Sequence, residues 1–347
     1  MAVLKTVARG TVKLLLGLLL LLIGFYLLLL AINWQDAKPN AASLHMQSLL
    51  QPPPIPAAQN GYQHFVAHHA SNELRLSESL QQLYHQCNQQ DCAEALTAKT
   101  DLAKLIAEHR QLMEFYQQLL QYPQWQEPPP TLQDIPLYQG LLHGQRLLLW
   151  QAWLEAQQGN NKQVKTALTA DYQFWKTVLA NTNSLITKMI SVAAIERHFI
   201  FVPEIVNQLS AEQRQTGVPT AWADAFSEKE LSLEQTMAGE WHYGADITST
   251  MRDTAPSGFG SDINTVETVF YLLVQPLILL QDTKNIYATQ LVQRNKTTQH
   301  SDYPWYSWLR NPVGKMLMVT GSVSYESYQQ RLLKLEQLRI NALQQAN

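Results

Sequence analysis

Cysteine, glycine and charged residues are scarce in this chain. Its 347 residues include two cysteines and 14 glycines, and 15% of the residues are charged. We find no P-loop, dinucleotide-binding glycine motif, G-x-S-x-G elbow or S-x-x-K motif, and no convincing glutamate–serine motif of a lytic transglycosylase. Nucleotide-binding, serine-hydrolase and penicillin-binding functions therefore have no support in the sequence, and no cofactor is indicated.

Strand patterns are also lacking, because no segment alternates polar and apolar residues over more than a few positions. The long periodic segments repeat apolar residues every three or four positions, as in "ALTAKTDLAKLIAEHRQLMEFYQQLLQ". This period is typical of one apolar helix face. The sequence therefore predicts an all-α fold.

One long hydrophobic run is present near the start of the chain. No residue from Leu14 to Ile32 is charged, and a helix of that length, about 28 Å, matches a hydrocarbon core of about 30 Å. The apolar part of a cleaved signal peptide is usually shorter and ends in a small-x-small site, which "LLLLAINWQDAKP" lacks. We predict a transmembrane signal anchor at 14–34 with Trp34 at the far interface, and a cleaved signal peptide is the alternative.

The charges around this run predict its orientation. Lys5, Arg9 and Lys13 precede it, and no acidic residue occurs before Asp36. The positive-inside rule therefore keeps residues 1–13 as a cytoplasmic tail and exports the remainder. The exported part has 22 basic against 28 acidic residues, a net charge of −6. This charge does not favour nucleic acid as a partner.

The two cysteines, Cys87 and Cys92, lie in "QCNQQDCAEAL" between two predicted helices, with Asp91 as N-cap of the second. Thiols outside the cytoplasm tend to oxidise, so we predict a structural disulfide across a tight turn. Redox-active pairs normally have the spacing C-x-x-C, which this is not. A metal site would need two further soft ligands, and only His85 is close.

The exported part is predicted to be divided by proline-rich stretches. Residues 35–59 form a spacer that includes "QPPPIPAAQN". A first helical block covers 60–122 and a second covers 135–347. The intervening stretch at 122–136 is either a domain boundary or a long surface loop.

The second block begins with a predicted helical hairpin. Two apolar-periodic segments are joined at "QQGNNKQ", where Gly159 provides a helix stop. Ala167 and a run of large apolar residues follow, a pattern that resembles a tetratricopeptide-type hairpin. No 34-residue period persists, so a regular repeat array is not predicted.

Three further predictions concern later helices. We expect a bend or break near Pro203, and a helix that ends near Gly239 before a loop at 243–261. The apolar segment from Val269 to Leu280 is too short to span a bilayer. It is predicted to be a buried helix, with an interfacial helix as the alternative.

The sequence "GEWHYGAD" places Glu240, His242 and Asp246 close together, as in a general base oriented by a carboxylate. A helix-capping network around an aromatic plug is the competing interpretation. These three residues are the candidate catalytic group.

Histidines form a second candidate. "HFVAHH" puts His64 and His68 four positions apart on one helix face, a spacing that can bind a metal ion. The glutamate of a zinc-protease H-E-x-x-H motif is replaced by Phe65, so a simple histidine cluster or a pH-responsive surface are the alternatives.

Charged residues interrupt an apolar helix at "IERHF". A buried charge must be paired, so Arg197 is expected to meet a carboxylate elsewhere in the fold. The functional alternative is an anion-binding arginine in a helical cleft.

Four short signatures resemble a group of single-pass inner-membrane proteins of Gram-negative bacteria with an all-helical periplasmic domain. They are "NGY" at 60–62, "LITKMI" at 185–190, "GEW" at 239–241 and "NPVGKML" at 311–317. The resemblance implies the topology and the source class. That group has no established activity, so no catalytic residue is implied.

Together these observations predict a membrane-anchored periplasmic protein whose helical domain binds or scaffolds an envelope partner without catalysis. The aromatic stretch "YPWYSWL" at 303–309 is either a contact surface or a core plug. Two alternatives remain open: a periplasmic hydrolase or lyase that uses Glu240, His242 and Asp246, and a carrier whose 269–280 helix lines a cavity for a lipid or small molecule.

Overall fold

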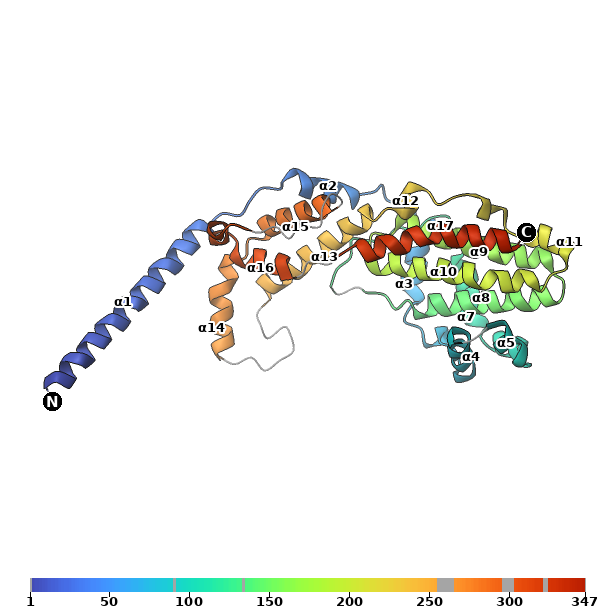
Figure 1. The fold of residues 1–347 in the computed structure, drawn as a ribbon, viewed down its shortest axis with the longest axis horizontal. Helices are drawn as coiled ribbons and strands as arrows, with labels where there is room; N and C mark the ends of the chain where they lie inside the picture. Colours follow the sequence, from blue (N-terminus) through green and yellow to red (C-terminus); the bar gives the residue numbers. More distant parts are fainter. Residues whose placement is uncertain are drawn as a thin grey trace. The chain divides into compact units, whose positions relative to one another are not determined.

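The computed structural model describes residues 2–89, 92–132, 135–254, 265–294, 303–320 and 324–346. Within these ranges every regular element is helical, apart from an isolated parallel bridge between Asn60 and Gln124, so the all-α prediction is confirmed there. The α-helices (Figure 1) are α1 Ala2–Ile32, α2 Ala41–Leu49, α3 Gly61–His68, α4 Glu78–Gln89, α5 Cys92–Ala98, α6 Leu102–Glu108, α7 Arg110–Leu119, α8 Gln139–Gln157, α9 Asn161–Asn181, α10 Leu185–Asn207, α11 Ala211–Gly217, α12 Glu228–Leu231, α13 Glu234–Asp253, α14 Thr265–Val274, α15 Leu280–Arg294, α16 Pro312–Thr320 and α17 Glu326–Ala346. Short 3-10 helices are η1 Ala57–Gln59, η2 Asn72–Leu74, η3 Thr220–Ala223, η5 Gln275–Leu277 and η6 Trp305–Leu309.

The chain forms two compact units, each built from two segments. Unit 1 comprises Met1–Ser48 and Trp241–Val323, and unit 2 comprises Leu49–Glu240 and Ser324–Asn347. Unit 2 contains helices from both predicted blocks, 60–122 and 135–347, and the second block also supplies most of unit 1.

The centre of unit 2 is a bundle in which α10 packs against α8, α9 and α17, and α7 packs against α8. The predicted stop between α8 and α9 is confirmed, because Gly159 has φ +77°, a left-handed conformation that favours glycine. Trp153 and Trp175 are buried, one on each helix of this hairpin. Burial of such side chains stabilises the bundle by about 1.5–3 kcal/mol each.

Helix α10 continues through Pro203, whereas the sequence predicts a bend or break there. Proline removes one backbone hydrogen bond and crowds the preceding turn. Val202, Pro203, Ile205 and Val206 are all buried, so packing of the helix within the bundle outweighs this cost. The prediction of a break is therefore wrong, and a bend at Pro203 stays a prediction.

Helix α13 also extends further than predicted. It continues past Gly239 to Asp253, so residues 243–253 of the predicted loop at 243–261 are helical. The Trp241 indole donates a hydrogen bond to the carbonyl of Lys284, 2.9 Å away, and Thr248 bonds the carbonyl of Gly244 within the helix. These contacts stabilise a stretch for which glycine and aspartate favour a loop.

One helix among the described residues is long and apolar enough to cross a membrane. It is the part of α1 from Gly10 to Ile32, which has 23 residues and a mean hydropathy of 3.0. None of its most apolar stretch is buried in the protein. This length and composition fit a single-pass anchor and also fit a signal sequence.

The segment predicted to be a buried helix, Val269 to Leu280, is divided in the structure. No residue of α14 is buried, and burial begins only with Leu277, Ile278 and Leu279 after it. The prediction of a buried helix is therefore wrong for α14. The apolar side chains of α14 are exposed, and the carrier hypothesis stays a prediction.

A disulfide joins Cys87 at the end of α4 to Cys92 at the start of α5, as predicted. The proposed N-cap, Asp91, lies outside the described residues. Helices α4 and α5 pack against each other. Leu80 and Leu83 on α4 and Leu96 on α5 are buried, and the Tyr84 ring of α4 contacts Arg146 of α8.

We expect the Cys87→Ser/Cys92→Ser double variant to lose about 2 kcal/mol of unfolding free energy, because the bond closes only a short loop. For a unit of this size the melting temperature should fall by about 4–8 °C. Thermal unfolding of the detergent-solubilised protein measures this shift. Reduction of the wild-type protein should reproduce it, and an unchanged melting temperature after reduction would contradict a stabilising role.

Candidate functional site

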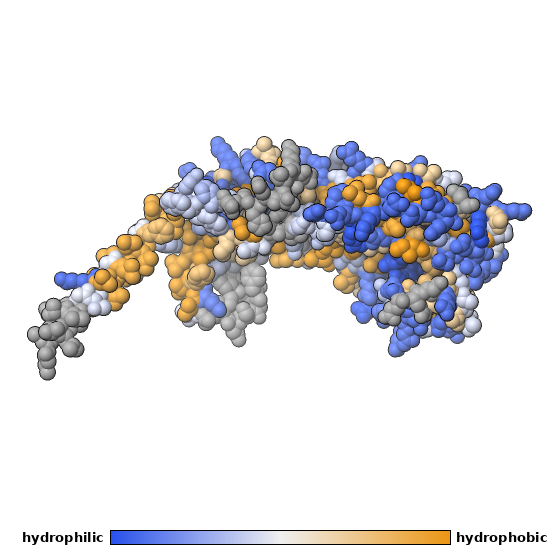
Figure 2. Space-filling view, viewed as in Figure 1, coloured by the Kyte–Doolittle hydropathy of each residue, from blue (hydrophilic) through white to orange (hydrophobic). Residues whose placement is uncertain are grey.

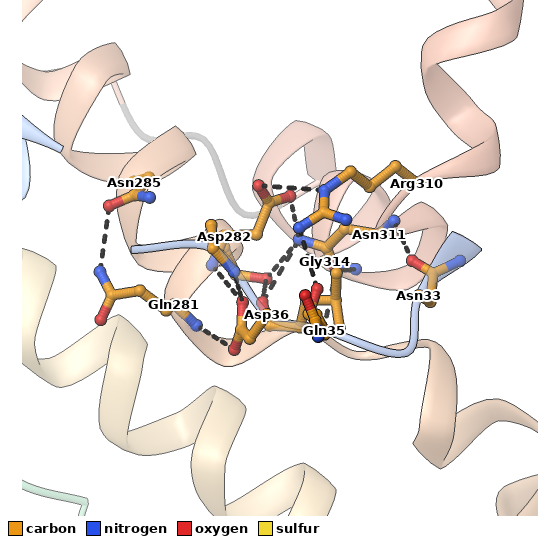
Figure 3. Close-up of polar contacts among 12 residues, drawn as sticks. Asn33, Gln35, Asp36, Gln281, Asp282, Asn285, Arg310, Asn311 and Gly314 are labelled. Atoms are coloured by element: carbon orange, nitrogen blue, oxygen red, sulfur yellow. Dashed lines mark hydrogen bonds and ion pairs between the residues drawn. The ribbon is translucent and has the colours of Figure 1, made fainter. Parts of the chain in front are cut away.

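The most extensive polar site of unit 1 lies where α1 ends. We call it the α1 junction and define it by Asn33, Asp36, Asn285, Arg310 and Asn311 (Figure 3). The five residues come from the segment after α1, from α15 and from the turn before α16. They lie up to 278 positions apart in the sequence.

Asn33 joins α1 to the rest of unit 1 and is only 4% exposed. Its amide nitrogen donates to the carbonyls of Leu29 (2.8 Å) and Leu309 (2.9 Å). Its amide oxygen accepts the backbone N–H of Asn311 at 2.6 Å. One side chain thereby satisfies a carbonyl at the end of α1 and two backbone groups before α16.

Arg310 bonds the same end of α1 from the other side. Its guanidinium donates to the carbonyls of Ile32 (3.3 Å) and Gln35 (3.1 Å). The last carbonyls of a helix have no partner within the helix and carry partial negative charge, so a cation here is stabilising.

Asp36 caps the next helix. Its carboxylate accepts the backbone N–H groups of Gln281 (2.8 Å) and Asp282 (2.9 Å) in the first turn of α15. A carboxylate in this position satisfies unpaired donors and complements the helix dipole.

Asn311 occupies the centre of the junction and is fully buried. Its φ is +49°, an uncommon conformation that asparagine tolerates better than most residues. The amide oxygen accepts the N–H groups of Leu279 (3.1 Å) and Gly314 (3.2 Å), and the nitrogen donates to Thr283 (2.9 Å). A Cβ at Gly314 would lie 2.0 Å from the Thr283 hydroxyl, so only glycine fits beside this amide.

Asn285 ties the beginning of the predicted 35–59 spacer to α15. Its side chain accepts from the Asn40 N–H (3.0 Å) and the Ser43 hydroxyl (2.8 Å), and donates to the Lys38 carbonyl (2.8 Å). Helix α2 follows directly within the same segment. Residues 35–48 are therefore an ordered part of unit 1.

The four signatures found in the sequence have one feature in common. Each supplies a side chain that hydrogen-bonds the backbone of a segment distant in the sequence. The bonds run from Asn60 to Gln126, from Lys188 to Glu230, from Trp241 to Lys284, and from Asn311 to Leu279. Each signature therefore contains a residue that joins two segments distant in the sequence.

The candidate catalytic residues Glu240, His242 and Asp246 all lie on α13. Burial raises the pKa of Glu240, and a hydrogen bond from the Leu185 N–H partly offsets this. Residues two positions apart on a helix project about 200° apart, so Glu240 and His242 occupy opposite faces. His242 and Asp246 lie one turn apart on the same face. This geometry lends no support to a shared three-residue site, and the catalytic hypothesis stays a prediction.

The histidines at 64 and 68 lie on one face of α3, with ring centroids 4.5 Å apart. His68 Nδ1 lies 2.8 Å from the His64 carbonyl, and the His64 ring stacks on Phe115 and Tyr122. Desolvation and the neighbouring His68 lower the pKa of His64. Among the described residues no group of three metal-binding side chains occurs, so the metal site also stays a prediction.

A buried polar cluster in unit 2 escaped the sequence analysis. The Asp171 carboxylate lies 2.7 Å from His198 Nδ1 and accepts bonds from the Tyr116 hydroxyl (2.5 Å) and the Gln145 amide (3.1 Å). Burial, together with Asp171, raises the pKa of Tyr116 well above its ordinary value. Asp171 and His198 have no exposed surface, so the bundle closes this pair off from any substrate. The sequence signal for this cluster is the presence of polar residues within apolar helices, as at "IERHF", which contains His198.

Arg197 bonds the Gln145 amide oxygen at 3.0 Å, whereas Glu196 pairs with Arg331 at 2.7 Å. The expected ion pair of Arg197 with a carboxylate is thus replaced by a hydrogen bond to the Gln145 amide, which also contacts Asp171.

Nearby, Arg146 lies over the Tyr84 ring, 3.4 Å from its centroid. Burial and the charge of Arg197 lower the pKa of Arg146 to about 9.

The surface of unit 2 has a concavity of about 600 Å³ between the proline-rich segment, α3 and the chain after α7. Leu50, Pro52, Tyr62, Val66 and Pro128 are among its lining residues, so it is mainly apolar. Another concavity of about 450 Å³, near Lys176 and Asp224, has a more polar lining. Both are large enough to hold a few side chains of a partner.

Comparison of the chain with protein-family models, curated protein sequences and solved structures gave no significant match.

We expect Asn311→Ala to destabilise unit 1 by at least about 3 kcal/mol, because it leaves buried N–H groups without partners and strains φ. Asn311→Gly loses the same hydrogen bonds and relieves the strain of a positive φ. We therefore expect it to be about 1 kcal/mol less destabilising than Asn311→Ala. Hydrogen exchange in α15 and α16 of the solubilised protein measures the loss. The exposed Asn341→Ala is the control, and equal exchange in Asn311→Ala and wild type would refute the central role of Asn311.

Lys188 gives a pH-dependent prediction. Its ammonium bonds the carbonyls of Leu179 (2.7 Å) and Glu230 (2.9 Å), and burial lowers its pKa to about 7. Between pH 7 and about 10.5 the unfolded chain holds a proton that the folded chain releases, so this residue makes stability rise with pH in that window. Below pH 7 Lys188 is charged in both the folded and the unfolded chain, so the full cost of burying its ammonium lowers the stability.

Lys188→Met should remove this slope, which is at most about 1.4 kcal/mol per pH unit. Chemical unfolding at pH 6, 8 and 10 tests it, with the exposed Lys162→Met as control for loss of a charge. A stability profile of Lys188→Met parallel to that of the wild type would show that Lys188 stays protonated in the fold.

Proposed function

We propose that the protein is a single-pass inner-membrane protein whose helical bulk lies in the periplasm and binds another envelope protein without catalysis. Helix α1 is the retained anchor, unit 1 is its folded continuation, and unit 2 is the binding domain. The observation that carries the proposal is the α1 junction.

The junction favours an anchor over a cleaved signal peptide. Tyr26 donates to the Leu273 carbonyl at 2.9 Å, and Asn33 is buried among unit 1 residues. A signal peptidase cut after residue 31, where the small residue Ala31 lies, would remove Tyr26 and leave the Asn33 contacts at a free terminus. Because unit 1 makes hydrogen bonds with residues of the apolar helix, its fold requires that this helix is not cleaved off.

The orientation follows from the basic residues before the apolar run, which favour a cytoplasmic start. The Cys87–Cys92 disulfide supports an oxidising compartment for unit 2. The resemblance to inner-membrane proteins of Gram-negative bacteria supports the inner membrane as the location and the periplasm as the compartment of the helical bulk.

The binding role is supported by the form of unit 2. Helices α8 and α9 pack together and are joined at Gly159, and their sequence resembles a tetratricopeptide-type hairpin, a scaffold for partner binding. The apolar concavity around Tyr62 and Val66 offers a contact surface for a partner. The polar pair Asp171–His198, which could otherwise support acid–base chemistry, is enclosed.

The proposal is tested in the native membrane. We expect the mature protein to keep the full mass of its chain and to resist carbonate extraction. After light cross-linking, a stoichiometric protein partner should co-purify and be identified by mass spectrometry.

We expect Val66→Asp to reduce recovery of this partner several-fold, because it places a charge in the apolar concavity. Val292→Asp is the matched control, since both valines are surface residues, 38% and 39% exposed, and Val292 lies on α15 in unit 1. Equal recovery with both variants would exclude the concavity, and a shortened mature protein would exclude the anchor.

A further inference from the structure

Helix α14 exposes an unusually apolar surface for its length. Val266, Val269, Phe270 and Leu273 follow the i, i+3, i+4, i+7 pattern that places side chains on one helix face. All four are exposed, Val266 at 76% and Phe270 at 67%. Figure 2 shows the hydrophobic surface over this helix.

The opposite face of α14 is held by polar contacts. The Tyr271 hydroxyl and the Gln275 amide both donate to the Arg252 carbonyl at the end of α13, over 2.6 and 2.7 Å. Glu267 and Thr268 lie on the same side of the helix as Tyr271. The helix is therefore amphipathic, and unit 1 itself fixes which face points outward.

The position of α14 relative to α1 indicates what covers the apolar face. The Leu273 carbonyl accepts the Tyr26 hydroxyl, and Tyr26 is six residues, about 9 Å, before the end of α1 at Ile32. If α1 spans a bilayer, this contact lies within the hydrocarbon region of the leaflet on the side of unit 1. Figure 1 shows α14 beginning to diverge from α1 near the end of α1, and Figure 2 shows hydrophobic surface over both helices.

Aromatic residues at the same end of α1 mark the boundary of that leaflet. Trp34 is 84% exposed directly after α1, and Trp305 and Tyr306 are exposed on η6. Leu309, at the end of η6, bonds Asn33. Tryptophan and tyrosine are enriched at membrane–water interfaces, where their rings lie among the lipid headgroups.

We propose that α14 is embedded in the outer leaflet beside α1, with its apolar face among the acyl chains and its polar face against α13. At ten residues it is too short to cross the bilayer. It serves as a second point of membrane attachment for unit 1, of the interfacial-helix kind. This inference rests on the proposed function, because it requires α1 to span the membrane.

The test uses spin labels on the full-length protein in lipid nanodiscs. The native cysteines are joined in a disulfide, so a label attaches only to an introduced cysteine. The variants are Val269→Cys on α14, Leu20→Cys in the middle of α1 and Val292→Cys on α15. The measurement is the collision rate of each label with oxygen, which concentrates in acyl chains, and with a water-soluble nickel chelate.

We expect the ratio of oxygen to nickel collisions to be several-fold higher at 269 and 20 than at 292. A high ratio at 20 with a low ratio at 269 overturns the leaflet position of α14 and leaves the anchor intact. A low ratio at 20 overturns the anchor itself, so the two failures are distinct. Low collision rates with both reagents at 269, with dipolar broadening between labels, would assign this face to a second copy of the chain.

An independent variant checks the result without a label. Val269→Asp/Phe270→Asp places two charges on the exposed apolar face and leaves the bonds of Tyr271 and Gln275 in place. We expect it to raise protease sensitivity of the 265–294 segment in nanodiscs several-fold, and to have little effect in detergent, where no leaflet orients the helix. Equal sensitivity of variant and wild type in nanodiscs would contradict the proposal.

Discussion

The hydrogen bonds between Asn33 and the turn at Asn311 are the contacts on which unit 1 depends. The Leu309 carbonyl and the Asn311 N–H in this turn are bonded by a side chain, because η6 ends at Leu309 and α16 begins at Pro312. Two buried amide side chains supply these partners, Asn33 for Asn311 and Leu309, and Asn311 for Leu279 and Gly314. An unpaired buried N–H costs about 1–3 kcal/mol, so the segments hold one another in place.

These bonds make unit 1 a strongly non-local assembly. Its two segments are separated by 192 residues of unit 2, from Leu49 to Glu240. Contacts between distant segments are slow to form, because a long loop must close before they contribute. In unit 2 the central hairpin α8–α9 is local, so its packing can form early.

Helix content and the α8–α9 hairpin could be predicted from the sequence because periodicity and a stop glycine are local signals. The disulfide followed from spacing and compartment. Helix α14 does not fit the prediction of a core helix, because hydrophobicity alone does not say whether a side chain is buried in protein or exposed. The α1 junction and the Asp171 cluster were missed for a different reason: asparagine-to-backbone bonds leave no periodic pattern, and Asp171 meets partners 26–55 positions away.

Under the proposed single-pass topology, the dependence of unit 1 on the last turns of α1 has a consequence for shedding from the membrane. Many anchored proteins release an intact ectodomain when a protease cuts the stalk beside the bilayer. Here a cut between Tyr26 and Asn33 would remove the bond to Leu273 and free the end held by Arg310. The released chain would carry a damaged unit 1, so detachment and local unfolding would occur together, and a stable soluble form would not arise by proteolysis at this point.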